Sequence, residues 1–225
     1  MYSIIRLSSD PSVVGVTDES QCYLSNNNLD NILITHWGCR ESWHNIGVTP
    51  KDESQGEEFK LTLKANLTDF VSFTPYLINC YLVSEKTKLL LDKHKLKNAI
   101  LFNVSLLSGG EKLNYFLLHV WQIENELVDY SQTILSEGIL SNEVLLKPKD
   151  QQEFESLKSK YPFCNFKKTT LNDKFDNKID LFKNIDGEIY ISESLRKAFI
   201  QNEISGINIL VNKGDLSKWP VISTN

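Results

Sequence analysis

The sequence predicts an α+β fold made of mixed, mainly antiparallel sheets with a few packed helices. Three observations lead to this prediction. Short apolar runs with the alternation of strands recur along the chain, amphipathic stretches that begin at Ser or end before Pro interrupt them, and a Gly-Gly pair separates two long apolar runs. Of the 225 residues, 41% are hydrophobic and 24% are charged, which is typical of folded globular proteins.

The first third of the chain is predicted to contain strands and loops. We expect strands over Tyr2–Leu7 and Ile32–His36, with a polar loop over Cys22–Asn28 between them. Residues 47–58 combine Pro, two Gly and several charges, which predicts an exposed loop. Phe59–Lys64 then alternates apolar and polar residues, so we predict a half-buried strand there.

The middle of the chain is predicted to contain a capped helix and a hairpin. Ser84 is a good N-cap and Glu85 suits the first helical turn, where the helix dipole favours negative charge. The apolar runs Ala99–Leu107 and Leu113–Ile123 are separated by two glycines. We expect these runs to be strands that pair antiparallel.

The last third is predicted to add two helices and three short strands. The expected helices are Pro148–Tyr161 and the stretch that Ser192 caps, which ends near Asn202. The expected strands are Ile179–Phe182, Glu188–Ile191 and Ile207–Val211. The polar stretch 171–178 is expected to be a loop, and the tail from residue 214 is polar, with Trp219-Pro220 as a candidate anchor.

Two segments resemble each other at an offset of 108 residues. The pattern Tyr81-Leu82-Val83-Ser84-Glu85 matches Ile189-Tyr190-Ile191-Ser192-Glu193, and each predicts a strand, a Ser-Glu cap, a helix, a turn and a strand. Duplication and reuse of a favourable cap both explain the likeness, and duplication implies two similar strand-helix-strand units. We divide the chain into a β-rich N-terminal region over residues 1–66 and an α+β region over residues 67–225, with one continuous domain as the alternative.

Charge and composition exclude several classes of function. The formal net charge is −5 and no basic stripe is present, so we expect no direct binding to nucleic acid. The start of the chain lacks a signal-peptide pattern, and no apolar stretch reaches the roughly 20 residues that span a bilayer. We therefore expect a cytoplasmic protein with no membrane-embedded segment. The four cysteines form no CxxC pair and are expected to be reduced and mostly buried.

Reactive motifs are sparse. The sequence has no GxxxxGKS/T, no GxGxxG after a strand, no GxSxG and no HExxH. Cys22, His36, Cys39 and His44 lie close in sequence, but their spacing does not match common zinc sites. Nothing beside any cysteine would activate a thiol in a Cys-His pair. We expect no metal, no cofactor and no catalytic residue, and hence no enzyme.

Acidic groups and two tryptophans are the candidates for a contact surface. The acids are Glu57, Glu58, Glu124, Glu126 and Asp129, and the tryptophans are Trp37 and Trp43. Solvated acids and tryptophans packed beneath a loop are the plain alternatives. The functional alternative is a negative surface that faces a basic partner, with the tryptophans as interface anchors. General acid–base catalysis by such acids would require that they converge in a cleft.

Short motifs in the second half resemble the closing segment of the immunity protein 11 family. The matching stretches are Asp180-Leu181-Phe182, then Ile189-Tyr190-Ile191-Ser192-Glu193-Ser194-Leu195-Arg196-Lys197-Ala198, then Ile204-Ser205-Gly206-Ile207. Family members combine D-x-F, a hydrophobic residue followed by S-E-x-L, and a later glycine before a hydrophobic residue. Ser84-Glu85 and Asp129-Tyr130-Ser131 look similar to the middle of the family, so the resemblance covers residues 70–211.

The resemblance implies a function in bacterial polymorphic-toxin systems, where members of this family are predicted antidotes. It implies a protein that binds and neutralises a cognate toxin by stoichiometric contact, and it brings no catalytic residues. Toxins that attack nucleic acid tend to be basic, so an acidic antidote would be steered onto such a nuclease. Two alternatives stay open: an enzyme or small-ligand-binding domain with an unrecognised site, and an interaction module outside toxin biology.

Overall fold

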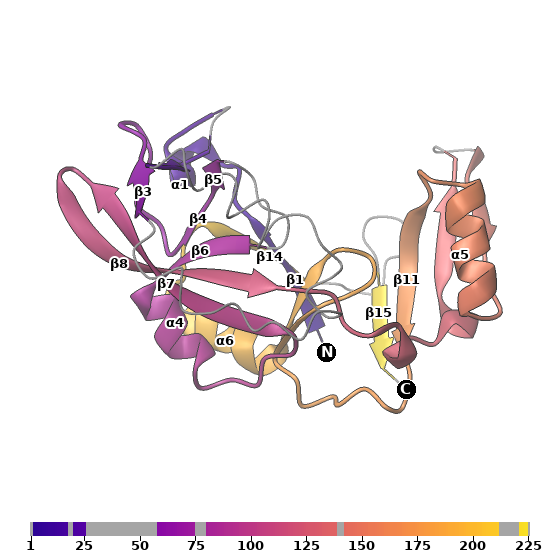
Figure 1. Cartoon of the computed structure of the whole chain (residues 1–225). Helices are drawn as coiled ribbons and strands as arrows, with labels where there is room; N and C mark the ends of the chain where they lie inside the picture. Colours follow the sequence, from indigo (N-terminus) through magenta and orange to yellow (C-terminus); the bar gives the residue numbers. More distant parts are fainter. Residues whose placement is uncertain are drawn as a thin grey trace.

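The computed structural model, shown in Figure 1, describes residues 2–17, 20–25, 58–74, 80–138, 142–211 and 221–224. The helices in these residues are α1 (Pro11–Val14), α4 (Glu85–Leu91), α5 (Gln151–Lys160) and α6 (Glu193–Gln201). The strands form mainly antiparallel sheets, which confirms the α+β fold. Among the described residues, no helix combines the length and the apolar character needed to cross a membrane.

The strands of the described residues are arranged in three sheets. The largest has the order β4 (Phe70–Val71), β6 (Cys80–Ser84), β8 (Glu111–Val120), β7 (Ala99–Ser108), β3 (Glu58–Leu61), β2 (Cys22–Leu24) and β5 (Phe73–Thr74). The second has the order β12 (Leu181–Lys183), β13 (Ile189–Ser192), β1 (Tyr2–Leu7) and β14 (Ile207–Val211). The third has the order β10 (Val144–Leu146), β9 (Ile134–Glu137), β11 (Asn165–Leu171) and β15 (Val221–Thr224).

Two structural units repeat within these sheets. The first unit consists of β4, β6, α4, β7 and β8, and the second consists of β12, β13, α6, β14 and β1. In the first unit, Leu118 of β8 lies opposite Tyr81 and Leu101. In the second unit, Ile5 of β1 lies opposite Ile189 and Ile209, which keeps the offset of 108 residues. The first strand of the chain therefore takes the place in the second unit that β8 takes in the first.

A central core joins the two units. Equivalent positions on the two units fill it: Val83 and Ile191, Leu91 and Phe199, Leu118 and Ile5, all buried. Each such side chain contributes roughly 1.5–3 kcal/mol when it leaves water. Helices α4 and α6 lie side by side on this core, and the Nζ of Lys86 on α4 donates to the carbonyl of Glu203 just after α6 (Figure 1).

Different segments cover the outer faces of the two units. Over the first unit, Phe59 and Phe73 belong to a core cluster built with β2, β3 and β5. Over the second unit, Tyr130 and Phe175 come from connections between strands and belong to another cluster. Helix α5 packs on the third sheet, where the ring of Phe154 contacts the rings of Tyr130 and Phe166. The two similar units are thus covered by different segments of the chain.

Most of the predicted elements are present. The strand Tyr2–Leu7, the helices that Ser84 and Ser192 cap, the Gly-Gly hairpin and the strand Ile207–Val211 are confirmed. Strands β1, β2 and β3 belong to the predicted β-rich N-terminal region, and they are hydrogen-bonded to strands of the predicted α+β region or to each other. The predicted strand Ile32–His36 and the loop residues 47–57 lie outside the described residues.

Three segments differ from the predictions. The start of the predicted loop Cys22–Asn28 is strand β2, because Cys22 is buried and pairs with Leu61. Strand β3 begins at Glu58, the last residue of the predicted loop 47–58, and it ends at Leu61 instead of Lys64, since a turn begins at Leu63. Residues 165–171, for which no element was predicted, form strand β11, and part of the polar tail forms strand β15, which pairs with β11 in parallel.

Candidate functional site

Three of the predicted acids lie together on the connection between β8 and β9. Glu124 and Glu126 are exposed and Asp129 is half-buried. They alternate with Ile123, Val128 and Tyr130, which are buried in the core of the second unit. Because the apolar residues anchor the connection from inside, the carboxylates are turned outward. We call residues 124–129 the acidic connection.

The backbone of the acidic connection is held in place by the end of strand β11. The N–H of Asp129 donates to the carbonyl of Thr170 at 2.8 Å. Asn172 donates through its N–H to the carbonyl of Leu127 at 3.0 Å and through Nδ2 to that of Glu126 at 2.7 Å. The carboxylates are therefore presented on a fixed backbone, which lowers the entropic cost of binding a partner.

The acids of this connection differ in their electrostatic surroundings. Glu124 lies 3.1 Å from the Nζ of Lys97. Partial burial raises the pKa of Glu124, but hydrogen bonds from its own backbone N–H and from Lys97 outweigh that effect and hold it below the usual value. The Oδ1 of Asp129 accepts from the hydroxyl of Ser131 at 2.6 Å. Glu126 makes no ion pair with any residue that the structure describes, so its charge is the most available to a partner.

The remaining predicted contact residues do not join this group. Glu58 lies on β3, where its carboxylate is 3.9 Å from the Nζ of Lys112 at the hairpin end of β8. The acidic connection follows the opposite end of β8, about 26 Å away at the rise of a strand. Glu57, Trp37 and Trp43 lie outside the described residues.

The cysteines of the described residues are buried in apolar surroundings. Cys22 is 1% exposed in the core of the first unit, and burial raises the pKa of its thiol. Cys80 and Cys164 are also buried, and both are thiols. Within the described stretches of the chain, no three His, Cys, Asp or Glu side chains are grouped so that they could hold a metal ion. His36, Cys39 and His44, which lie close to Cys22 in the sequence, are outside those stretches.

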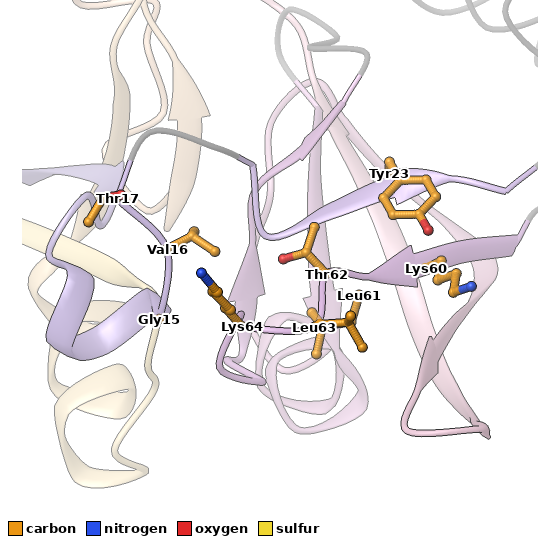
Figure 2. A pocket seen from close by; sticks show the side chains of 9 residues that line it. All are labelled: Gly15, Val16, Thr17, Tyr23, Lys60, Leu61, Thr62, Leu63 and Lys64. Atoms are coloured by element: carbon orange, nitrogen blue, oxygen red, sulfur yellow. The ribbon is translucent and has the colours of Figure 1, made fainter.

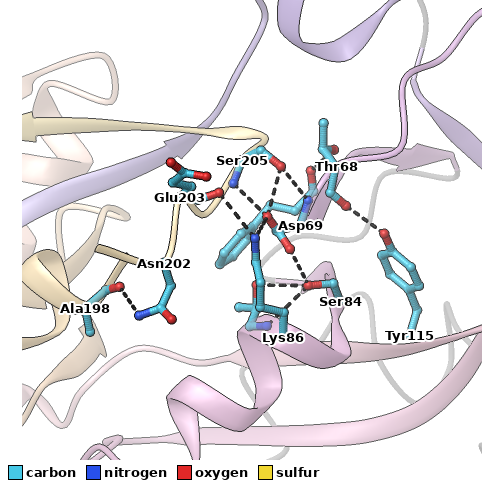
Figure 3. Close-up of polar contacts among 11 residues, drawn as sticks. Thr68, Asp69, Ser84, Lys86, Tyr115, Ala198, Asn202, Glu203 and Ser205 are labelled. Atoms are coloured by element: carbon cyan, nitrogen blue, oxygen red, sulfur yellow. Dashed lines mark hydrogen bonds and ion pairs between the residues drawn. The ribbon is translucent and has the colours of Figure 1, made fainter. Parts of the chain in front are cut away.

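An open hollow of about 540 Å³ lies beside Asp69 in the first unit. The Asp69 carboxylate accepts from the Oγ of Ser84 at 2.7 Å and from the N–H of Ser205 at 3.0 Å, and it lies 2.9 Å from the Nζ of Lys86 (Figure 3). Burial raises the pKa of Asp69, but these contacts outweigh it and lower the pKa overall. The carboxylate oxygens of Asp69 thus connect the start of β4 to α4 and to the turn after α6.

Asp180 repeats this arrangement in the second unit. Its carboxylate accepts from the Oγ of Ser192 and from the N–H of Lys95, the latter at 3.0 Å, and lies 3.1 Å from Nδ1 of His94. Each aspartate thus binds the serine that caps its own helix and the turn that follows the helix of the other unit. Asp69 and Asp180 therefore hold the two units together in the same way, and we call each aspartate with its capping serine a clasp.

The motif residues that resemble the immunity protein 11 family lie where they stabilise the packing of the two units. Asp180 and Ser192 form the clasp of the second unit, and Phe182 and Leu195 are fully buried. Gly206 has a positive φ of 85°, and a Cβ there would lie 2.1 Å from the carbonyl oxygen of Phe70. These motif residues determine how the two units pack.

A second open hollow, of about 720 Å³, lies between the turn after α1 and strands β2 and β3 (Figure 2). Lys60, Lys64 and Tyr23 line it, and Leu63 is fully exposed at its edge. No group of acids converges there among the lining residues. This surface was not predicted from the sequence, because its residues come together through the pairing of β2 with β3 and the hydrogen bond from the N–H of Asn66 to the carbonyl of Val14.

A comparison of the chain with protein-family models and with curated proteins finds no match. The likeness to the immunity protein 11 family therefore depends on the motif residues whose positions are given above.

Proposed function

We propose that the protein is a cytoplasmic immunity protein that binds a cognate toxin domain and neutralises it by stoichiometric contact. One observation carries the proposal. The motif residues that resemble an immunity family are the clasp, core and close-approach residues of the repeated units, so they stabilise the fold of this chain. We infer that the family shares this fold and a mode of action in which a rigid body presents a contact surface.

The acidic connection is the surface that we assign to the toxin. It exposes carboxylates on a backbone that β11 holds fixed. A net charge of −5 favours the approach of a basic toxin, such as a nuclease, and complementary charge accelerates such encounters. Inhibition then requires contact alone.

Co-expression tests the proposal. The product of the gene immediately upstream, which the proposal takes to be the toxin, is expressed in cells with and without this chain, and an unrelated toxin of similar charge serves as the control. We expect growth to be rescued from the neighbouring toxin alone. Failure of purified chain to bind that toxin domain would refute the proposal.

A further inference from the structure

The outer edge of the third sheet is an open apolar strand. Strand β10 is the last strand on that side of the sheet among the described residues. Its residues Val144 and Leu145 are 56% and 53% exposed, so apolar side chains face water on both sides of this edge. Natural edge strands are usually shielded by charge or by covering elements, because an open edge is a template for another strand.

The sequence around β10 is complementary to itself when two copies run antiparallel. If a two-fold axis passes through Leu145, each Leu145 lies opposite the other, and Val144 lies opposite Leu146 of the second copy. In the same register Glu143 lies opposite Lys147, and this pair occurs twice. Opposite charges at directly facing positions stabilise antiparallel strands, and like charges destabilise them.

The charged groups of this register are exposed. Lys147 is exposed and makes no ion pair with any residue that the structure describes. Glu143 lies 2.6 Å from the Nζ of Lys167, which holds its pKa below the usual value and keeps it ionised near neutral pH. Lys167 belongs to β11, on the far side of β9, so in this register Glu143 is shared between Lys167 and Lys147 of the second copy.

We propose that β10 is an interface for a second copy of this chain, which pairs antiparallel through Leu145 and joins two third sheets into one. The dimer buries little area beyond the edge strands, so it is weak and depends on concentration. Each copy in the dimer carries its own acidic connection, and the third sheets of the two copies form one continuous sheet. The pairing does not involve the toxin, so it can be tested on the isolated chain.

Sedimentation of the full chain over a range of concentrations gives the first test. We expect a monomer–dimer equilibrium that Leu145→Lys abolishes, because two ammonium groups then meet at the axis. Leu89→Lys is the matched control, since Leu89 is also 53% exposed but lies on α4. A chain that stays monomeric to about 1 mM, or a dimer that survives Leu145→Lys, would overturn the proposal.

Charge exchange tests the register. Lys147→Glu and Glu143→Lys should each weaken self-association about tenfold, because each places two like-charged pairs at the edge. Mixed in equal amounts, the two variants should form a heterodimer as strong as the wild-type dimer, since both charge pairs are restored. If the mixture associates no better than either variant alone, the register is wrong.

Cross-linking gives an independent readout. Directly opposite residues of antiparallel strands have Cα atoms about 4.5–5.5 Å apart, which suits a disulfide. Leu145→Cys should therefore form a covalent dimer under mild oxidation, whereas Leu89→Cys and the wild type should not. Equal cross-linking of all three would contradict the proposed axis.

Discussion

Tyr2 and Tyr115 make the same hydrogen bond in the two units. The hydroxyl of Tyr115 donates to the carbonyl of Thr68 at 2.7 Å, and that of Tyr2 donates to the carbonyl of Ile179 at 3.0 Å, with the carbonyl of Asn177 also within reach at 3.1 Å. Thr68 and Ile179 each precede the aspartate that clasps the other unit. A residue at the start of the chain therefore repeats the role of one near its middle, which follows if β1 is the counterpart of β8.

We predict that Tyr2→Phe and Tyr115→Phe destabilise the protein by similar amounts. Each removes one buried hydrogen bond and leaves a carbonyl without its partner, at a cost of about 1–2 kcal/mol. Urea unfolding at pH 7.5 measures the loss. Both hydroxyls are neutral there, because burial raises the pKa of Tyr2 to about 12 and raises that of Tyr115 further. Tyr23→Phe, at an exposed position, is the control and should change nothing. A loss at Tyr115 with none at Tyr2 would contradict the equivalence.

Alanine substitutions at Gly206 and Gly187 distinguish the cost of backbone strain from the cost of a steric clash. Both have φ near +85°, so an alanine at either position costs about 1–2 kcal/mol from the left-handed backbone. A Cβ at Gly187 meets nothing within 4 Å, whereas at Gly206 it would collide with the carbonyl of Phe70. We expect Gly206→Ala to lower the free energy of unfolding by roughly 2 kcal/mol more than Gly187→Ala does. Equal losses would show that the turn after α6 is not packed against β4.

Asp186 makes the stability of the fold depend on pH between 5 and 7.5. Burial raises the pKa of Asp186 to about 6, although the hydroxyl of Tyr190 donates to its carboxylate at 2.6 Å. Because the folded pKa lies above the unfolded one, ionisation as pH rises through 6 favours the unfolded state. We predict that the wild type is about 1 kcal/mol more stable at pH 5 than at pH 7.5.

Asp186→Asn removes the ionisable group while it retains the shape of the protonated acid. The difference between pH 5 and pH 7.5 should then fall by about 1 kcal/mol, as measured by urea unfolding at both values. Asp69 and Asp180 do not contribute in that window, because their contacts keep each pKa below its usual value, and their stabilisation is lost only at lower pH. A pH dependence that persists undiminished in Asp186→Asn would assign it to another group.

Charge reversal distinguishes the acidic connection from Glu58. We predict that Glu126→Lys weakens binding of the toxin domain about tenfold and reduces its dependence on salt, because it removes an unpaired carboxylate from the contact. Glu58→Lys makes the same chemical change near the hairpin end of β8 and should leave the affinity unchanged. Titration at two salt concentrations measures both effects. The reverse order of effects would place the contact at the hairpin end of β8.

Local signals made a large share of the fold predictable. Ser84 and Ser192 were predicted as helix caps, and each accepts a hydrogen bond from the backbone N–H three residues later. The Gly109-Gly110 turn was predicted because glycine tolerates the positive φ that both residues adopt. Such features depend only on neighbouring residues, so a single sequence is enough to find them.

Long-range pairing explains what the sequence did not reveal. Strand β11 contains two lysines and two threonines in a row, and it is a strand because β9 and β15 pair with it. Asp69 was not identified from the sequence. It lies 15 residues before Ser84, whereas Asp180 lies 12 residues before Ser192, so the two aspartates do not align at the constant offset of 108 residues. The adjacency of Glu124, Glu126 and Asp129 was local and predictable, whereas the distance to Glu58 depends on the length of β8.

Calorimetric titration of the neighbouring toxin domain into the purified chain tests the proposed function most directly. We predict saturation at one toxin per chain, with an affinity that falls as salt is added and loss of toxin activity at the same molar ratio. Absence of binding heat, together with an active toxin in the presence of excess chain, would contradict the account.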